Sequence, residues 1–257
     1  SSAIKRDNAE WMEACAQRIP VVPRAEMLAE LMRFRRGIAI AGTHGKTTTT
    51  SLTASVLGEG GLDPTFVIGG QLLAAGANAR LGSGDWLAAE ADESDGSFLR
   101  LNPQIAVVTN IDADHLENYG GDFARVQAAF SEFLHRLPFY GLAVLCIDDA
   151  EVAALAVDMP RHVITYGFAA HADVRAEDVE QAGPAMRFTL CLPDGSRTPA
   201  TLALPGRHNV QNALAAATIG WQLGVAPETI ARALEKFAGI GRRFNLLAEI
   251  TTAQGAK

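Results

Sequence analysis

Residues 42–48 read Gly-Thr-His-Gly-Lys-Thr-Thr and have the residue types of a phosphate-binding loop. Glycines let backbone N–H groups approach phosphate oxygens, a lysine reaches the β and γ phosphates, and the threonine after it can ligate Mg²⁺. The usual pattern has a further glycine five residues before the Gly-Lys pair, where this sequence has Ile40. We therefore predict a shortened phosphate loop of the form G-x-x-G-K-T, rather than an ordinary glycine turn.

Two polar segments follow apolar runs farther along the chain. Residues 90–95 (EADESD) carry four acidic groups, and residues 109–115 (TNIDADH) end in an Asp-x-Asp-His cluster. Carboxylates suit Mg²⁺, which prefers oxygen ligands, and we expect the metal near the phosphate loop. The alternatives are a solvated acidic loop for the first segment and a capping or surface histidine, His115, for the second.

Two later segments carry amides and arginines. Residues 206–212 (GRHNVQN) place Asn209 and Asn212 on one helical face, and amides can both donate to and accept from an adenine edge. Helix capping is the alternative role for Asn209. Residues 239–244 (GIGRRF) could place a guanidinium on a transferring phosphoryl group, although an arginine pair between glycines is weak evidence alone.

Alternating strands and helices position these segments. The loop lies between a predicted strand at 37–41 and a Thr-rich helix at 46–57, and the polar segments follow strands ending at 89 and 109. Carboxyl ends of parallel strands meet at one edge of an open α/β sheet, where ligands bind. Further predicted elements are strands at 65–68, 142–147 and 162–166, helices at 23–34, 122–137, 209–223 and 227–237, and a hairpin of 186–192 with 201–204. This pattern predicts an α/β fold: a P-loop-type, mostly parallel sheet with flanking helices and a small antiparallel β patch.

Composition narrows the class of protein. The chain has 22 Lys and Arg against 29 Asp and Glu, a net charge of -7, so nucleic acid is not an expected partner. No apolar run reaches the roughly 18 residues of a membrane helix, so no membrane association is expected. Cys15, Cys146 and Cys191 are widely spaced, which predicts free, buried thiols in a reducing compartment. We therefore expect a cytoplasmic protein.

Five segments, in this order, resemble the Mur ligase family, the ATP-dependent amide-forming enzymes of peptidoglycan precursor synthesis. They are residues 42–48 (GTHGKTT), 90–95 (EADESD), 109–115 (TNIDADH), 206–212 (GRHNVQN) and 239–244 (GIGRRF). Within the family, Thr49 and residues 137–141 (LPFYG) add to the likeness to one type of ligase. The family's phosphate loop has the same shortened form. The resemblance implies three regions: residues 1–36 as the end of an N-terminal UDP-sugar domain and linker, 37–243 as the central ATP-binding domain, and 244–257 as a linker toward a C-terminal domain. We therefore expect an excised piece of a longer enzyme.

The resemblance also implies roles for individual residues. Lys46, Glu90, His115 and Arg243 would be catalytic, and Thr47, Glu90 and His115 would hold Mg²⁺. Choosing between Glu90 and Glu93 as the metal ligand is open, because both lie on the same loop. Several relatives use a carbamylated lysine, but no lysine lies between Lys46 and Lys236 here, and Glu93 is a candidate substitute. The residues expected to bind ATP are Gly42, Thr43, His44, Gly45, Lys46, Thr47, Thr48, His208, Asn209, Asn212 and Arg243.

The implied reaction is phosphoryl transfer from ATP to the lactyl carboxylate of UDP-N-acetylmuramate, followed by attack of L-alanine's amine on the acyl phosphate. The substrates expected for the full-length enzyme are thus UDP-N-acetylmuramate and L-alanine, with ATP and Mg²⁺ as cofactors. We expect this fragment to be inactive as a ligase. Three alternatives stay open: a ligase attaching a recycled peptide to the same sugar, a P-loop kinase, and a nucleotide-binding module without turnover.

Overall fold

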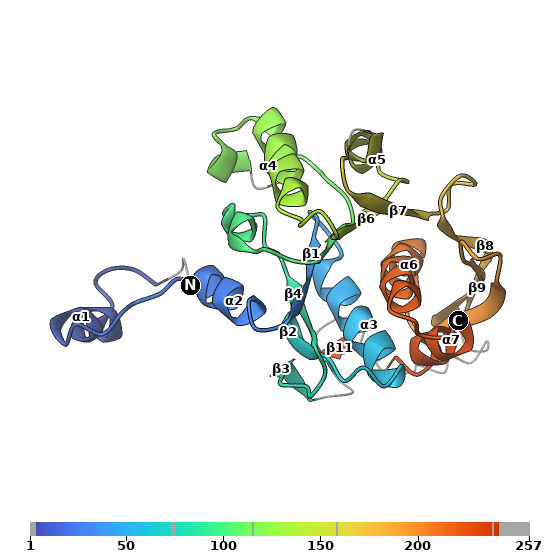
Figure 1. The fold of residues 1–257 in the computed structure, drawn as a ribbon, viewed down its shortest axis with the longest axis horizontal. Coiled ribbons are helices and arrows are strands. Elements are labelled where there is room, and N and C mark those ends of the chain that lie inside the picture. Colours follow the sequence, from blue (N-terminus) through green and yellow to red (C-terminus); the bar gives the residue numbers. More distant parts are fainter. Residues whose placement is uncertain (1–3, 73–75, 115, 158, 238, 242–257) are drawn as a thin grey trace, which may run out of the picture.

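One mixed β-sheet runs through the protein with helices on both of its faces (Figure 1). The computed structural model describes residues 4–72, 76–114, 116–157, 159–237 and 239–241. The helices are α1 (Ala9–Ala16), α2 (Arg24–Met32), α3 (Lys46–Glu59), α4 (Phe123–His135), α5 (Ala150–Val157), α6 (Arg207–Gln222) and α7 (Pro227–Glu235), with 3₁₀ turns η1 (Ser97–Arg100) and η2 (Leu116–Tyr119). The strands are β1 (Arg36–Ala41), β2 (Thr65–Leu72), β3 (Ala77–Arg80), β4 (Trp86–Glu90), β5 (Ile105–Val108), β6 (Leu142–Cys146), β7 (His162–Gly167), β8 (Val174–Ala182), β9 (Ala185–Cys191), β10 (Arg197–Leu202) and β11 (Ile240–Gly241).

The strand order places the three motif-bearing strands side by side. Within the described residues the order is β10-β9-β8-β7-β6-β5-β1-β4-β2-β11, with β3 paired to β2. Strand β1 lies between β4 and β5 and is parallel to both, with Ile40 opposite Glu90 and Ala41 opposite Val108. The phosphate loop, the acidic segment and the segment after β5 therefore leave the sheet at neighbouring positions on one edge.

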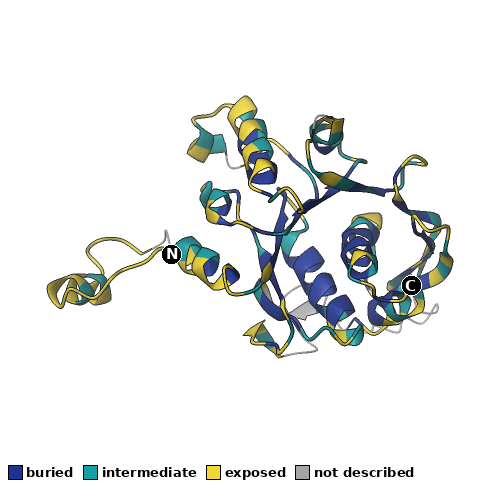
Figure 2. Ribbon diagram, in the orientation of Figure 1, coloured by how far each residue is buried: buried dark blue, intermediate teal, exposed yellow. Residues whose placement is uncertain are grey.

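Two apolar cores lie on the two faces of the sheet (Figure 2). Ile38 and Ile40 of β1 belong to the core under α3, α6 and α7, whereas Ala39 and Ala41 belong to the core under α2, η1 and α4. Successive side chains of a strand point to opposite faces, so a strand covered on both sides reads as a continuous apolar run. This is the origin of the apolar signal at residues 37–41.

Helix α3 is buried although threonine and serine make up much of its sequence. It lies between the sheet and helices α6 and α7, and ten of its fourteen residues are buried. The hydroxyl of Thr50 donates to the Lys46 carbonyl (2.8 Å), and that of Ser51 donates to the Thr47 carbonyl (2.7 Å). Bonding back to the previous turn satisfies these hydroxyls, so small polar side chains can line a tight interface.

The predicted α/β fold with its mostly parallel sheet and antiparallel patch is confirmed, including the 186–192/201–204 hairpin as β9 and β10. The sequence analysis missed β8, which pairs with β9 to enlarge the patch, and it missed β3, α1 and α5. The charged residues of β8 and its irregular pairing between Glu177 and Glu180 hide the alternation of a strand. The expected burial of all three cysteines is wrong for Cys15, which is exposed on α1, a helix with no buried residue.

In the part of the chain that the structure describes, none of the helices combines the length and the apolar character needed to cross a membrane.

Candidate nucleotide-binding site

The phosphate loop depends on glycine at two positions. Gly42 and Gly45 have φ angles of +132° and +87°, where residues with a side chain are strained. A Cβ atom at Gly42 would also overlap the hydroxyl of Thr109, and one at Gly45 would lie 2.5 Å from Oδ1 of Asn212. Conformation and space both require glycine, so the loop passes closely between β5 and α6.

The segment after β5 braces the loop. The backbone N–H of His44 donates to Oδ1 of Asn110 (2.8 Å), and Nδ2 of Asn110 donates back to the His44 carbonyl (3.0 Å). The backbone N–H of Asp112 donates to the Thr43 hydroxyl (2.9 Å). His44 and Asp112 have exposed side chains 3.8 Å apart, an ion pair when the imidazole is protonated. The loop conformation is thus set by its neighbour as well as by its own glycines.

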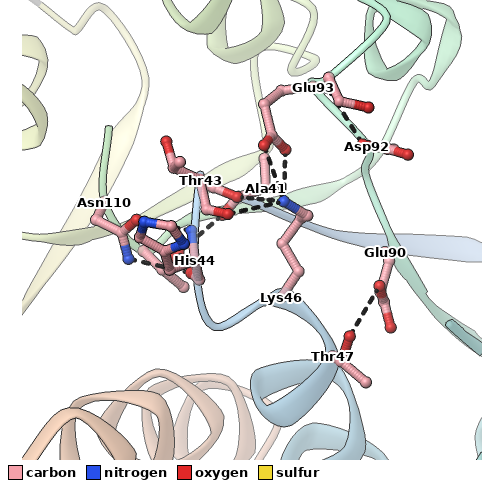
Figure 3. A network of polar contacts seen from close by, with 12 residues as sticks. Ala41, Thr43, His44, Lys46, Thr47, Glu90, Asp92, Glu93 and Asn110 are labelled. Carbon is pink, nitrogen blue, oxygen red and sulfur yellow. Dashed lines mark hydrogen bonds and ion pairs between the residues drawn. The ribbon is translucent and has the colours of Figure 1, made fainter. Parts of the chain in front are cut away.

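Lys46 begins α3 and folds back over the loop (Figure 3). Its ammonium group donates to the carbonyls of Gly42 (2.7 Å) and Thr43 (3.2 Å) and to Oε1 of Glu93 (2.9 Å). Three acceptors match the three hydrogens of an ammonium group. The lysine expected to contact phosphates is therefore held at the mouth of the loop in this structure.

Glu90 and Glu93 take different partners, as Figure 3 shows. The Thr47 hydroxyl donates to Oε2 of Glu90 (3.2 Å), and the backbone N–H of Gly69 donates to Oε1 of Glu90 (2.6 Å). The carboxylate of Glu93 is buried against Lys46, and burial raises its pKa above the usual range, although the Lys46 charge opposes this shift. The geometry therefore separates two carboxylates that the sequence could not distinguish.

The Glu90–Thr47 pair fits Mg²⁺. One carboxylate and one hydroxyl at a helix N-terminus supply hard oxygen ligands, and Mg²⁺ completes its shell with waters and nucleotide phosphates. Across the described residues, no three His, Cys, Asp or Glu side chains form a metal-binding group. Such a cluster is not required for an ion that is held mainly by its nucleotide.

Helix α6 reaches the loop through buried amides. Oδ1 of Asn212 accepts from the Thr49 hydroxyl (3.1 Å), and Nδ2 of Asn212 donates to Asn209 (3.3 Å). Nδ2 of Asn209 donates to the Pro205 carbonyl (2.7 Å). Both side chains, expected beside adenine, lie within the protein, with 1% of Asn209 and 7% of Asn212 exposed. The N-cap position of α6 is occupied by Gly206, so Asn209 is not the cap.

The structure brings together most of the residues predicted for the site. Gly42, Thr43, His44, Gly45, Lys46, Thr47 and Glu90 lie at the carboxyl edge of β1 and β4, and Thr48 is buried in the first turn of α3. His208 is exposed at the start of α6, next to Gly206. His115 and Arg243 lie outside the described residues.

Four contacting residues were not among the predicted site residues. Thr109 and Asn110 donate side-chain hydrogen bonds to the His44 carbonyl. Tyr119 donates to the Glu93 carbonyl, and Asn118 donates to the Ser94 carbonyl (2.7 Å). Thr109 and Asn110 lie within the polar segment after β5, where their spacing gave a signal. Asn118 and Tyr119 gave none, because they act through backbone atoms of a distant segment.

A parallel sheet with a G-x-x-G-K-T loop between β1 and α3 defines the P-loop class of α/β proteins. Residues 40–220 match the model of the Mur ligase middle domain, and residues 1–36 match a model described as the Mur ligase family, catalytic domain. The chain belongs to the Mur ligase family.

Individual relatives support this placement. Over all 257 residues the chain is 80% identical to the UDP-N-acetylmuramate--L-alanine ligase of Xanthomonas campestris pv. campestris, covering 54% of it. The chain thus spans about half the length of the curated relatives it matches. The UDP-N-acetylmuramate-alanine ligase of Thermotoga maritima superposes with a TM-score of 0.83 at 28% identity, over 96% of this chain and 56% of that one. The UDP-N-acetylmuramate:L-alanyl-gamma-D-glutamyl-meso-diaminopimelate ligase of Neisseria meningitides gives 0.79 at 27% identity, over 93% and 78%.

Proposed function

We propose that the chain is the ATP-binding part of a ligase that joins L-alanine to the lactyl carboxylate of UDP-N-acetylmuramate, giving ADP and phosphate. The observation that carries this proposal is the phosphate loop with Lys46 and the Thr47–Glu90 pair at one sheet edge, within a chain 80% identical to a ligase of that name. We propose the same division of the chain: 1–36 as the end of the UDP-sugar domain and linker, 37–243 as the ATP-binding domain, and 244–257 as the link onward.

The residues suit phosphoryl transfer, which needs positioning and charge stabilisation more than a protein nucleophile. Backbone N–H groups at the start of α3 and the Lys46 ammonium would bind phosphate oxygens. Mg²⁺ held by Thr47 and Glu90 would neutralise phosphate charge in a site that already contains Glu90, Asp92 and Glu93. We keep His115 as a further metal ligand and Arg243 as a phosphate contact, both on the resemblance alone.

We propose that adenine lies at the first turn of α6, near His208, Asn209 and Asn212. The support is that this turn lies beside the phosphate loop, since Oδ1 of Asn212 is 2.5 Å from where a Cβ atom of Gly45 would be. Asn212 also bonds Thr49 of α3, and Asn209 accepts a hydrogen bond from Asn212. We further propose a cytoplasmic location, because all three cysteines are free thiols, which persist in reducing compartments.

The second candidate is a ligase that attaches a recycled peptide to UDP-N-acetylmuramate. Its support is the fold similarity to the Neisseria meningitides ligase at 27% identity. The 80% identity to alanine-adding relatives favours L-alanine instead.

A calorimetric titration of the chain with ATP, with and without Mg²⁺, tests the proposal. Lys46→Ala should weaken Mg-ATP binding about 10- to 100-fold, the range expected when a charge-assisted hydrogen bond is lost. Lys236→Ala is the matched control, because Lys236 is an exposed lysine that pairs with Glu59. Equal affinity of the Lys46 variant and the parent would contradict the phosphate-loop assignment.

Phosphate release by the full-length enzyme then identifies the acceptor. We expect release from ATP to require both UDP-N-acetylmuramate and L-alanine. Turnover with a peptide in place of L-alanine would favour the second candidate. Accumulation of phosphorylated sugar nucleotide over many turnovers, without any amine, would indicate a kinase.

A further inference from the structure

The Lys46–Glu93 ion pair lies directly over the phosphate loop. Nζ of Lys46 is 2.9 Å from Oε1 and 2.8 Å from Oε2 of Glu93, and the two side chains are only 17% and 5% exposed. A buried ion pair must recover a large desolvation cost, so it is weak evidence of a role in stability. The pair also includes the lysine that is expected to bind phosphates, so we consider a role in nucleotide binding.

Glu93 is held in place by a second segment as well as by the lysine. The hydroxyl of Tyr119 in η2 donates to the Glu93 carbonyl, and Asn118 donates to the next carbonyl, that of Ser94. These bonds fix the backbone on which the carboxylate stands. The backbone at Glu93 thus has an anchor that is independent of Lys46.

The carboxylate depends on Lys46 for charge compensation. Its Oε2 atom is buried and has no hydrogen-bond partner within the described part of the chain, and it lies 2.8 Å from the Lys46 ammonium. Asp92 is a neighbouring anion, so Lys46 is the cation that balances this position. An incoming phosphate needs the same ammonium group.

From this geometry we propose that Glu93 is a positioning residue: it holds the Lys46 ammonium across the mouth of the phosphate loop and competes with the terminal phosphates of the nucleotide for it. The inference rests on the proposed function. Two anions compete for one cation inside a poorly solvated site, so nucleotide affinity is set lower than the loop alone would give. In exchange, the lysine is ordered before the nucleotide arrives.

The test is the affinity of Glu93→Gln for a series of Mg-nucleotides. Glutamine keeps the shape and the hydrogen bond to Lys46 but removes the charge. We expect binding of ATP to tighten roughly three- to tenfold, which corresponds to a modest electrostatic repulsion removed. The gain should be smaller for ADP and absent for AMP, which has no β or γ phosphate.

Asp95→Asn is the matched control on the same loop, because the Asp95 carboxylate accepts from the Ser97 backbone N–H (2.9 Å). We expect this variant to have the same affinity as the parent for ATP, ADP and AMP.

Tyr119→Phe removes only the hydroxyl that holds the Glu93 backbone. It should shift ATP affinity in the same direction as Glu93→Gln, but by less. A loss of affinity for all three nucleotides in Glu93→Gln would show a merely structural brace and overturn the proposal, as would unchanged ATP affinity.

Acylation of Lys46, followed by mass spectrometry, separates this inference from the proposed function. Without nucleotide, Lys46 should react several-fold faster in Glu93→Gln than in the parent, whereas Lys236 should react equally in both. Failure of the parent to bind ATP would overturn the proposed function, and this labelling would still decide whether Glu93 holds the lysine. Equal labelling of Lys46 in the two proteins would overturn the inference even if ATP binds.

Discussion

At the scale of the residue, the phosphate loop depends on single atoms. Gly42 and Gly45 combine left-handed backbone angles with neighbours that leave no room for a Cβ atom. Only two residues separate Glu90 from Glu93 in the chain, yet Glu90 contacts Thr47 and Glu93 contacts Lys46. Small displacements of this kind decide which side chain can hold a metal and which can hold a lysine.

Gly42→Ala should therefore destabilise the protein by about 1–3 kcal/mol, because the new methyl group meets Thr109 and the backbone angle is strained. Gly58→Ala is the matched control, since Gly58 lies in α3 with nothing near its Cβ position. Alanine there should stabilise the helix by about 0.5–1 kcal/mol. Urea denaturation measures both, and equal stability of the Gly42 variant and the parent would contradict the strain argument.

At the scale of the element, α3 is the centre of the site because the sheet, α6 and α7 all pack against it. The bond from Thr49 to Asn212 is the polar link between α3 and α6, and both side chains are buried. A substitution or displacement in α6 can thus alter the phosphate loop through Asn212, which lies next to Gly45.

Asn212→Ala should cost about 1–3 kcal/mol, because it leaves the buried Thr49 hydroxyl without this acceptor. Thr49→Val removes the partner, so the double variant should be less destabilised than the sum of the single variants, by about 0.5–3 kcal/mol. Gln222→Ala, at the exposed last residue of the same helix, is the control and should change stability by less than about 0.5 kcal/mol. Urea denaturation of the two single variants and the double variant measures this coupling energy. Additive effects would show that the Thr49–Asn212 bond contributes nothing to stability.

At the scale of the whole molecule, burial protects two of the three thiols. Cys146 ends β6 and Cys191 ends β9, and both are buried, whereas Cys15 is exposed on α1. Burial raises the pKa of the Cys146 thiol to about 12, from an ordinary value of 9.0. Because the folded state favours the neutral thiol, its contribution to stability is complete below pH 9 and is lost as the pH rises toward 12.

We expect a thiol reagent at pH 8 to modify Cys15 rapidly and the other two cysteines only after unfolding. The free energy of unfolding should fall between pH 9 and pH 10.5, and Cys146→Ala should reduce that fall. Mass spectrometry of the labelled peptides and urea denaturation over this pH range measure the two effects. Rapid labelling of Cys146 in the folded protein would contradict its burial.

Local sequence patterns predict the α/β class, the parallel centre of the sheet and the phosphate loop. Buried strands appear as apolar runs, and the loop needs its glycines and lysine in one short segment. In contrast, the contact of Glu93 with Lys46, the burial of Asn209 and Asn212, and the pairing of β8 in the sheet emerge in the folded chain alone. The reason is physical: these outcomes depend on contacts between segments far apart in the chain, such as Tyr119 with Glu93 and Thr49 with Asn212, whose pairing no local pattern of residues encodes.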